Sequence, residues 1–155
     1  MKLGIKGEQL IKSYEQLRLR AYAATADERK RGIWTIGWGH TKGVKEGDVC
    51  TQEQAQEWFD EDTAEAVKCV NDHVKITLSQ NEFDALVSFC FNVGAGRVEP
   101  RKDGFITSTL LKLLNSHAIE AAANEFLKWN KQSGVVLSGL TKRRLEEKAL
   151  FLGEV

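Results

Sequence analysis

The part of the sequence that decides the fold is the run IWTIGWGHT at residues 33–41. β-Branched and aromatic residues favour strands, whereas Gly37 and Gly39 interrupt the run, so it predicts a short strand that enters a tight turn. Upstream, residues 17–22 alternate between apolar and basic types and predict a second extended segment. Residues 23–32 are polar and end in glycine, which predicts a loop or turn. Together these segments predict a small β-lobe of about three short strands.

Helical periodicity dominates the remainder of the chain. Thr51 and Gln54 form a capping-box pattern, and apolar residues at spacings of three and four then predict a long helix over about residues 52–71. A short amphipathic helix is expected near the N-terminus, although Gly7 weakens its start. The remaining predicted helices, with the N-terminal one, cover residues 4–14, 79–92, 107–115, 118–129 and 141–152.

These elements predict one domain over residues 1–155, in the α+β class but mostly α. A small β-containing N-lobe would cover about residues 12–51, and the long helix at about 52–71 would connect the lobes. An all-helical C-lobe would cover about residues 72–155 and include the N-terminal helix. Two lobes joined by a helix would leave a cleft, which is a common place for a ligand site.

Composition excludes several classes of function. The 22 Lys and Arg residues balance the 22 Asp and Glu residues, and zero net charge argues against a dedicated nucleic-acid binder. Cys50, Cys69 and Cys90 lack paired spacing, so they predict buried thiols rather than disulfides or metal ligands, and no cofactor is expected. The first residues hold no apolar run suited to a signal peptide or membrane anchor, so we expect synthesis in the cytoplasm.

Glu15 lies at the junction between the first predicted helix and the first predicted strand. A carboxyl group with one apolar side is desolvated, which would raise its pKa and let it carry a proton near neutral pH. Glycoside cleavage needs such a general acid and a second group across the sugar ring, for which Asp27, Glu28 and Thr35 are candidates. Periodicity alone leaves open the simpler alternative, a solvated surface glutamate.

Two segments in register, EQLRLRAY at residues 15–22 and GIWTIGWGHT at residues 32–41, resemble the signature of phage-type lysozymes, glycoside hydrolase family 24, the group of the T-even phage lysozyme. The resemblance continues to residue 146 and covers nearly the whole chain. It implies a lysozyme-like fold and an endolysin that hydrolyses the β-1,4 bond between N-acetylmuramic acid and N-acetylglucosamine in bacterial peptidoglycan. It also implies that Glu15 is the general acid and Thr35 the threonine of the catalytic centre.

The sequence departs from the family at the second carboxylate. The family aspartate usually follows the tyrosine by two residues, and Ala24 occupies that position here, within a longer loop. Asp27 is the preferred replacement and Glu28 a weaker one; otherwise the carboxylate is absent. With an aspartate in place, the resemblance implies an inverting reaction, for which the two carboxyl groups would lie about 6.5–9.5 Å apart.

Further site residues are expected around this centre. Trp34 is a candidate for stacking on a sugar ring, and His40 for bracing the β-lobe or contacting substrate. The resemblance suggests that Arg144 or its neighbour Arg143 reaches toward Glu15.

Two other functions stay open. A lytic transglycosylase needs only one glutamate, because the C6 hydroxyl of the sugar attacks, and this fits Ala24. A lysozyme-like protein could instead bind peptidoglycan without cutting it, although Glu15 and Thr35 argue against that. The resemblance further implies a monomer that leaves the host cytoplasm and reaches periplasmic peptidoglycan once a holin-type membrane protein has permeabilised the inner membrane.

Overall fold

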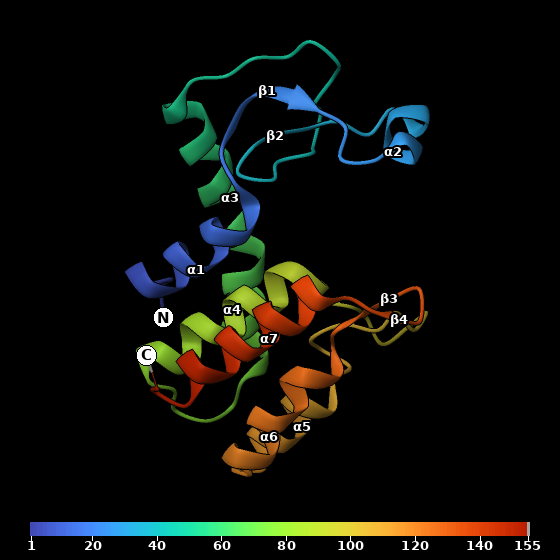
Figure 1. Ribbon diagram of the computed structural model, residues 1–155. Helices are drawn as coiled ribbons and strands as arrows, with labels where there is room; N and C mark the ends of the chain where they lie inside the picture. The colour runs from blue at the N-terminus through green and yellow to red at the C-terminus, as the bar shows by residue number, and fades with distance from the viewer. Residues whose placement is uncertain (155) are drawn as a thin grey trace. The chain divides into compact units, whose positions relative to one another are not determined.

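The computed structural model describes residues 1–154. Most of the elements are helices, as Figure 1 shows. In chain order they are α1 (Ile5–Glu15), β1 (Arg18–Tyr22), α2 (Ala26–Arg31), β2 (Thr35–Gly37), α3 (Gln52–His73), α4 (Gln80–Val93), α5 (Thr109–Asn115), α6 (Ile119–Glu125), the 3₁₀ helix η1 (Phe126–Lys128), β3 (Lys131–Gln132), β4 (Val135–Val136) and α7 (Ser138–Phe151). The expected class, mostly α with a small β component, is confirmed.

The chain forms two compact units. Unit 1 combines Met1–Leu10 with the chain from Glu65 onward, and unit 2 comprises Ile11–Ala64. The boundaries between the units therefore fall within helices α1 and α3. The prediction of an N-lobe at about 12–51 and a C-lobe at about 72–155 places the long helix between lobes, whereas this division assigns its two halves to different units.

Unit 2 is built on a two-stranded antiparallel sheet. Strands β1 and β2 pair with Arg18 opposite Gly37 and Tyr22 opposite Thr35, and the register shifts between these two points. The predicted third strand is reduced to a single bridge between Arg20 and Val49. Apolar side chains from both helices that enter the unit support the sheet, and those buried in its core include Ile11, Ile36, Ala55 and Phe59.

The prediction of a loop over residues 23–32 is wrong, because helix α2 occupies residues 26–31. The Thr25 hydroxyl accepts a hydrogen bond from the Glu28 amide, and Gly32 ends the helix in the left-handed conformation. Acidic residues fill the first turn and basic residues the last, an arrangement that complements the helix dipole. These capping signals are present in the sequence, but the absence of apolar periodicity conceals the helix.

Unit 1 is organised around α4 and α7, which run side by side (Figure 1). Phe89 of α4 is the centre of an aromatic cluster whose ring centroids lie 5.3–6.4 Å apart in edge-to-face geometry. Its partners are Phe105, Phe126 and Trp129. The expectation of an all-helical C-lobe is wrong in one detail, because β3 and β4 form a small hairpin with Ser133 and Gly134 at its turn.

Helix α1 begins against a buried carboxylate from α4. The two side-chain oxygens of Asp84 accept hydrogen bonds from the amides of Gly4 (2.8 Å) and Gly7 (3.1 Å). A Cβ on Gly7 would lie only 2.8 Å from Asp84 Cβ and Cγ, so glycine permits this close approach. Gly7 has a low helix propensity, but it allows Asp84 to cap α1. The negative carboxylate of Asp84 interacts favourably with the positive end of the helix dipole.

Capping residues account for the starts of three other helices. Thr51 and Gln54 exchange hydrogen bonds of 3.1 and 3.4 Å, as the sequence predicts for α3. Ser79 forms a full capping box with Glu82 at α4, and Ser108 caps α5. The single helix predicted over 118–129 is divided into α6 and η1, and α7 begins three residues earlier than the predicted residue 141.

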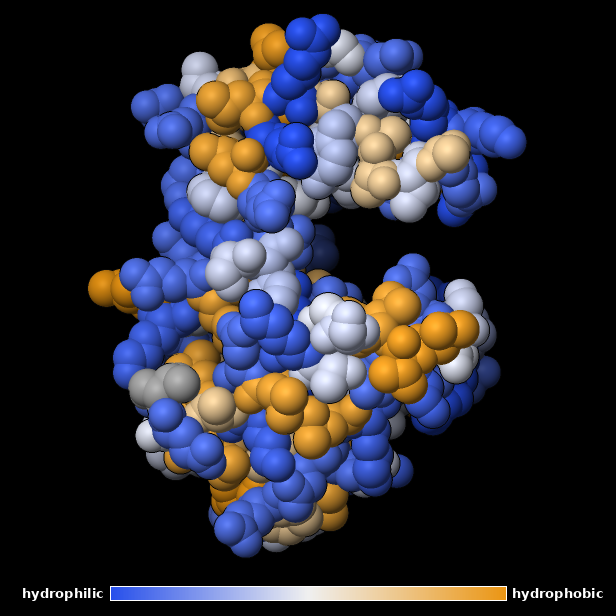
Figure 2. Space-filling model, in the orientation of Figure 1, coloured by the Kyte–Doolittle hydropathy of each residue, from blue (hydrophilic) through white to orange (hydrophobic). Residues whose placement is uncertain are grey.

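The surface is mostly polar. On the face drawn in Figure 2, hydrophilic residues predominate and apolar residues form separate patches. Among the exposed apolar side chains are Val135, Val136 and Leu137 of the β3–β4 hairpin and its exit. No helix within residues 1–154 has both the length and the apolar character needed to cross a bilayer.

Candidate functional site

Glu15 is the last residue of α1, as expected for a carboxylate at the junction of helix and strand. The helix stops because Gln16 adopts a left-handed backbone with φ 42° while its amide still donates to the Lys12 carbonyl. Strand β1 begins two residues later. The change of direction leaves the half-buried Glu15 side chain beside the turn that follows β2.

That turn is closed by Ile36 and His40, which exchange two backbone hydrogen bonds of 2.9 Å. Gly37 and Gly39 both have positive φ, 64° and 80°, a conformation that side chains disfavour. A Cβ on Gly39 would lie 2.2 Å from Glu15 Oε2, so the carboxyl group lies directly against this residue. The glycine-rich run and the upstream glutamate, which the sequence places in register, therefore meet in space.

His40 is fixed on two sides. Its Nδ1 lies 2.8 Å from Asp62 Oδ2, and its ring stacks on Trp58 with centroids 4.6 Å apart and planes 6° from parallel. The side chain is buried, so these contacts attach the turn to α3. The expected bracing of the β-lobe has this physical basis.

The two tryptophans of the run lie in different surroundings. Lys12 places its ammonium group 4.9 Å from the Trp38 ring centroid and donates to Gln56 Oε1 at 2.6 Å. Trp34 lies under the Arg29 guanidinium at 5.9 Å. Thr35, between them, is buried in β2 and pairs with Tyr22 of β1.

The two candidate second carboxylates point to different partners. Asp27 is exposed and forms a 3.5 Å ion pair with Arg31 along α2, a pair whose side chains are 74% and 65% exposed. Glu28 is less exposed, and its Oε2 accepts a 3.1 Å hydrogen bond from the amide of Ala24. Glu28 therefore places its carboxylate beside the chain position at which the family resemblance expects an aspartate.

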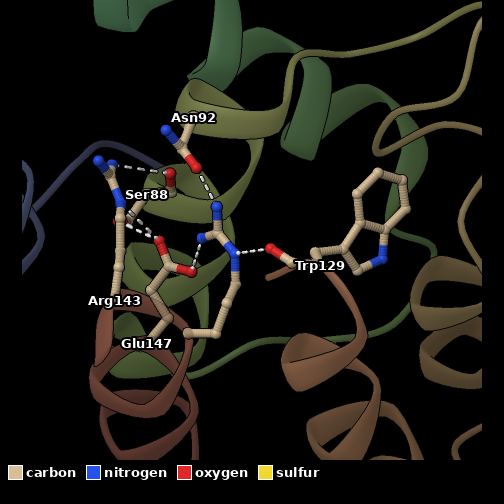
Figure 3. Close-up of polar contacts among 6 residues, drawn as sticks. Ser88, Asn92, Trp129, Arg143 and Glu147 are labelled. Carbon is tan, nitrogen blue, oxygen red and sulfur yellow. Dashed lines mark hydrogen bonds and ion pairs between the residues drawn. The ribbon is translucent and has the colours of Figure 1, made fainter. Parts of the chain in front are cut away.

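Arg144 belongs to a buried ionic cluster in unit 1, drawn in Figure 3. Glu147, fully buried, accepts hydrogen bonds from Arg144, from Arg143 Nε at 3.3 Å and from Ser88 Oγ at 2.6 Å. Arg143 also donates to the Ser88 carbonyl. Two guanidinium groups thus share one carboxylate in the interior, where each charge needs a partner.

Arg144 also reaches the wall of a pocket. Its Nε donates to the Trp129 carbonyl at 2.9 Å, and its second terminal nitrogen donates to Asn92 Oδ1. The pocket has a volume of about 410 Å³. Its lining residues are Asn92, Val93, Trp129, Lys131, Gln132, Leu140 and Arg144. Apart from Arg144, these residues lack a chemical signal in the sequence strong enough to have marked them as a site.

The cysteines are all free thiols, with Cys69 and Cys90 buried and Cys50 half-buried, so the expectation of burial holds for two of them. A hydrogen bond with Cys90, helped by nearby His73, lowers the pKa of Cys69 to about 7. The same hydrogen bond and burial raise the pKa of Cys90. Within residues 1–154, no group of three or more His, Cys, Asp or Glu side chains is arranged to hold a metal ion.

Comparison with known proteins identifies the family of this chain. Residues 12–147 match the phage lysozyme family. The chain is 44% identical to an endolysin of Acyrthosiphon pisum secondary endosymbiont phage 1, with 97% of this chain and 98% of the relative covered.

Two solved structures agree with this assignment. The endolysin from Escherichia coli O157:H7 phage FAHEc1 is 36% identical and superposes with a TM-score of 0.85, covering 100% of this chain and 96% of that one. The muramidase domain of SpmX from Asticaccaulis excentricus is 39% identical, with a TM-score of 0.82 and 97% of both chains covered. The chain belongs to the phage lysozyme family.

Proposed function

We propose that the chain is an endolysin, a muramidase that hydrolyses the β-1,4 bond between N-acetylmuramic acid and N-acetylglucosamine in bacterial peptidoglycan. Relatives named as endolysins and a neighbour described as a muramidase domain support this activity. The observation that carries the proposal is the Glu15 carboxyl group, held against Gly39 in the glycine-rich turn. A fixed carboxyl group at the end of a helix is suited to act as a general acid.

In the proposed mechanism, Glu15 donates its proton to the glycosidic oxygen as the bond to the leaving sugar breaks. Thr35 and a second carboxylate orient a water molecule on the opposite face of the sugar ring. The water attacks the anomeric carbon and transfers its proton to that carboxylate, which inverts the configuration. Nuclear magnetic resonance of the first product formed distinguishes this outcome from retention, which would contradict the inverting mechanism.

The second carboxylate in this proposal is Asp27, and the hydrogen bond to Ala24 makes Glu28 its competitor. Asp27→Asn and Glu28→Gln separate them, because glutamine keeps an oxygen that can accept from the Ala24 amide and so preserves the local structure. If Asp27 orients water, Asp27→Asn lowers kcat by about 10²–10⁴-fold and Glu28→Gln leaves it near the parent value. The reverse pattern assigns the role to Glu28.

If neither substitution lowers the rate, Glu15 and Thr35 act without a loop carboxylate. Thr35→Glu then tests the position of Thr35 directly. A carboxylate at residue 35 would attack the anomeric carbon or block the approach of water to it. A change from inverted to retained product would support the placement of Thr35 on the face opposite the acid.

Substrate binding is proposed to involve Trp34, His40 and Arg144. Trp34 offers a half-buried aromatic surface for a sugar ring, and His40 acts through the turn that it holds. Arg144 donates to the side-chain oxygen of Asn92 (Figure 3), and both residues line the pocket together with Lys131, so N–H donors border it. The pocket would therefore suit acceptor groups such as the acetamido carbonyl of a sugar or the carbonyls of a peptide stem.

Product analysis distinguishes the muramidase from two alternatives, a lytic transglycosylase and a non-catalytic binder of peptidoglycan. Hydrolysis of purified peptidoglycan releases new reducing ends, whereas a lytic transglycosylase leaves 1,6-anhydro ends. A non-catalytic peptidoglycan binder would release neither product and would not clear a suspension of chloroform-treated Gram-negative cells. Reducing ends with clearing support the muramidase, and anhydro ends or an absence of cleavage would contradict it.

In the infected cell we propose that the enzyme, a monomer, is made in the host cytoplasm and reaches periplasmic peptidoglycan with the help of a holin-type membrane protein. Expression without such a partner should leave host cells intact until the membrane is permeabilised. Prompt lysis on expression alone would contradict this dependence. We further propose that units 1 and 2 act as one catalytic domain, with α3 as its interlobe helix.

A further inference from the structure

The turn at residues 36–40 contains one position that has no room for a side chain. A Cβ on Gly39 would lie 2.2 Å from Glu15 Oε2, 3.0 Å from its Cδ and 3.6 Å from its Cγ. A separation of 2.2 Å does not occur between a Cβ and a non-bonded heavy atom, and one of 3.0 Å is tighter than most such contacts. The carboxyl group of Glu15 therefore occupies the space that any L-side chain at residue 39 would fill.

Other glycines with the same backbone conformation do not have this property. Gly32 and Gly43 have φ values of 71° and 73°, close to the 80° of Gly39, yet a Cβ on either would meet nothing within 4 Å. At those two positions glycine is favoured only because it adopts a positive φ without strain. At residue 39 glycine both adopts the positive φ and leaves space for the carboxyl group of Glu15.

We propose that Gly39 is a positioning residue for Glu15, because its missing side chain creates the seat in which the carboxyl group is held. This inference rests on the function proposed above and adds a specific determinant to it. The seat is rigid on the side of the turn, since Ile36 and His40 close it with two backbone hydrogen bonds. His40 is in turn held by Asp62 and Trp58, so the wall against Glu15 is anchored to α3.

The consequence for catalysis follows from the distances. An alanine methyl group at residue 39 needs ordinary van der Waals separation, so it would displace Oε2 by roughly 1 Å or rotate the carboxyl group away. A misplacement of this size costs about 10²-fold in rate when the reacting groups must be aligned. Gly39→Ala should therefore lower kcat about 100-fold, with KM changed by less than about threefold, because the carboxyl group that moves acts mainly in the transition state.

The matched control is Gly43→Ala, which introduces the same left-handed alanine without a neighbour to displace. Each substitution should lower the melting temperature by about 2–8 °C through backbone strain. Gly39→Ala should lower it further because of the clash. Gly43→Ala should leave kcat and KM within about twofold of the parent, and a 100-fold loss in this control would assign the kinetic effect to strain and overturn the proposal.

A double-mutant cycle in thermal stability tests the contact without reference to activity. In a Glu15→Ala background the carboxyl group is gone, so Gly39→Ala should lower the melting temperature no more than Gly43→Ala does. If Gly39→Ala alone fails to fold, the double variant should fold again. An excess loss that persists in the Glu15→Ala background, or failure of both variants to fold, would show that the clash is not with Glu15 and would overturn the proposal.

The two proposals can fail separately. If Glu15→Gln retains the parent rate, the assignment of the general acid is wrong, whatever the stability cycle shows. If Glu15→Gln is inactive and the cycle shows coupling, but Gly39→Ala keeps the parent kcat, the contact exists and the positioning role is wrong.

Discussion

Two glutamates, Glu15 in unit 2 and Glu147 in unit 1, have the same type of side chain in very different surroundings. Glu147 is fully buried and accepts hydrogen bonds from two arginines and a serine. Glu15 is half-buried at a helix end and lies against a glycine whose missing Cβ leaves it space. Hydrogen-bond donors surround the carboxylate of Glu147 in the interior, whereas the backbone at residue 39 leaves the space that the carboxyl group of Glu15 occupies.

The comparison also distinguishes the two units. Unit 1 encloses an aromatic cluster around Phe89 and beside it a buried ionic cluster, so its stability depends on the interior. Unit 2 has a two-stranded sheet and a short exposed helix, and His40 attaches its turn to α3 through Asp62 and Trp58. Substitutions should therefore cost most stability in the interior of unit 1 and least at the surface of unit 2.

The largest expected loss of stability is for Glu147→Gln. This change removes the buried carboxylate to which both arginines of the cluster in Figure 3 donate, and replaces it with a neutral acceptor. Breaking a buried ion pair in this way costs about 3–5 kcal/mol, measurable by urea unfolding. The neighbouring Glu146→Gln is the control, since its 4.0 Å pair with Lys142 is at the surface and should contribute less than about 1 kcal/mol. Equal free energies of unfolding for Glu147→Gln and Glu146→Gln would show that the buried ion pairs of Glu147 contribute no more than the surface pair of Glu146.

A smaller loss is expected for Asp62→Asn. The 2.8 Å contact with His40 holds the turn against α3, and its charge-assisted character would be lost. The expected cost is about 1–2 kcal/mol in thermal unfolding, together with a several-fold drop in kcat because the wall of the Glu15 seat loosens. Asp60→Asn, which changes an exposed carboxylate bonded to Gln56, should alter neither quantity appreciably. Unchanged stability in Asp62→Asn would show that stacking on Trp58 alone anchors His40.

The smallest loss is expected for Thr25→Ala at the start of α2. The Thr25 hydroxyl accepts from the Glu28 amide at 3.0 Å, and loss of such a cap costs about 1 kcal/mol. Because α2 is short and exposed, the effect should appear as faster amide hydrogen exchange within residues 26–31 rather than as a large change in melting temperature. Thr25→Ser keeps the hydroxyl and should exchange like the parent; if it exchanges like Thr25→Ala, the cap is not what orders the helix.

Much of this fold could be predicted from local patterns, for reasons that particular residues illustrate. Thr51 with Gln54 fixes the start of α3, Ser79 the start of α4, and the run at residues 33–41 gives the strand and turn. Apolar periodicity does not predict helix α2, because the helix has capping residues but no buried face. The β3–β4 hairpin was missed because each strand has only two residues.

The candidate site could be predicted only in part. The proximity of Glu15 to the glycine turn could be predicted, because the family pattern spaces the two segments in register along the chain. The buried partners of Arg144 could not be found in this way, since Ser88, Asn92 and Glu147 come together only through the packing of α4 against α7. The contact of Glu28 with Ala24 likewise depends on helix α2, which apolar periodicity does not predict.

The most direct test of the account is the rate at which Glu15→Gln releases reducing ends from purified peptidoglycan, measured beside its melting temperature. Glutamine preserves the size and shape of the side chain in its seat but has no acidic proton to donate. We expect Glu15→Gln to lose activity by at least about 10³-fold, with a melting temperature within about 2 °C of the parent. Activity within tenfold of the parent, in a protein that is equally stable, would contradict it.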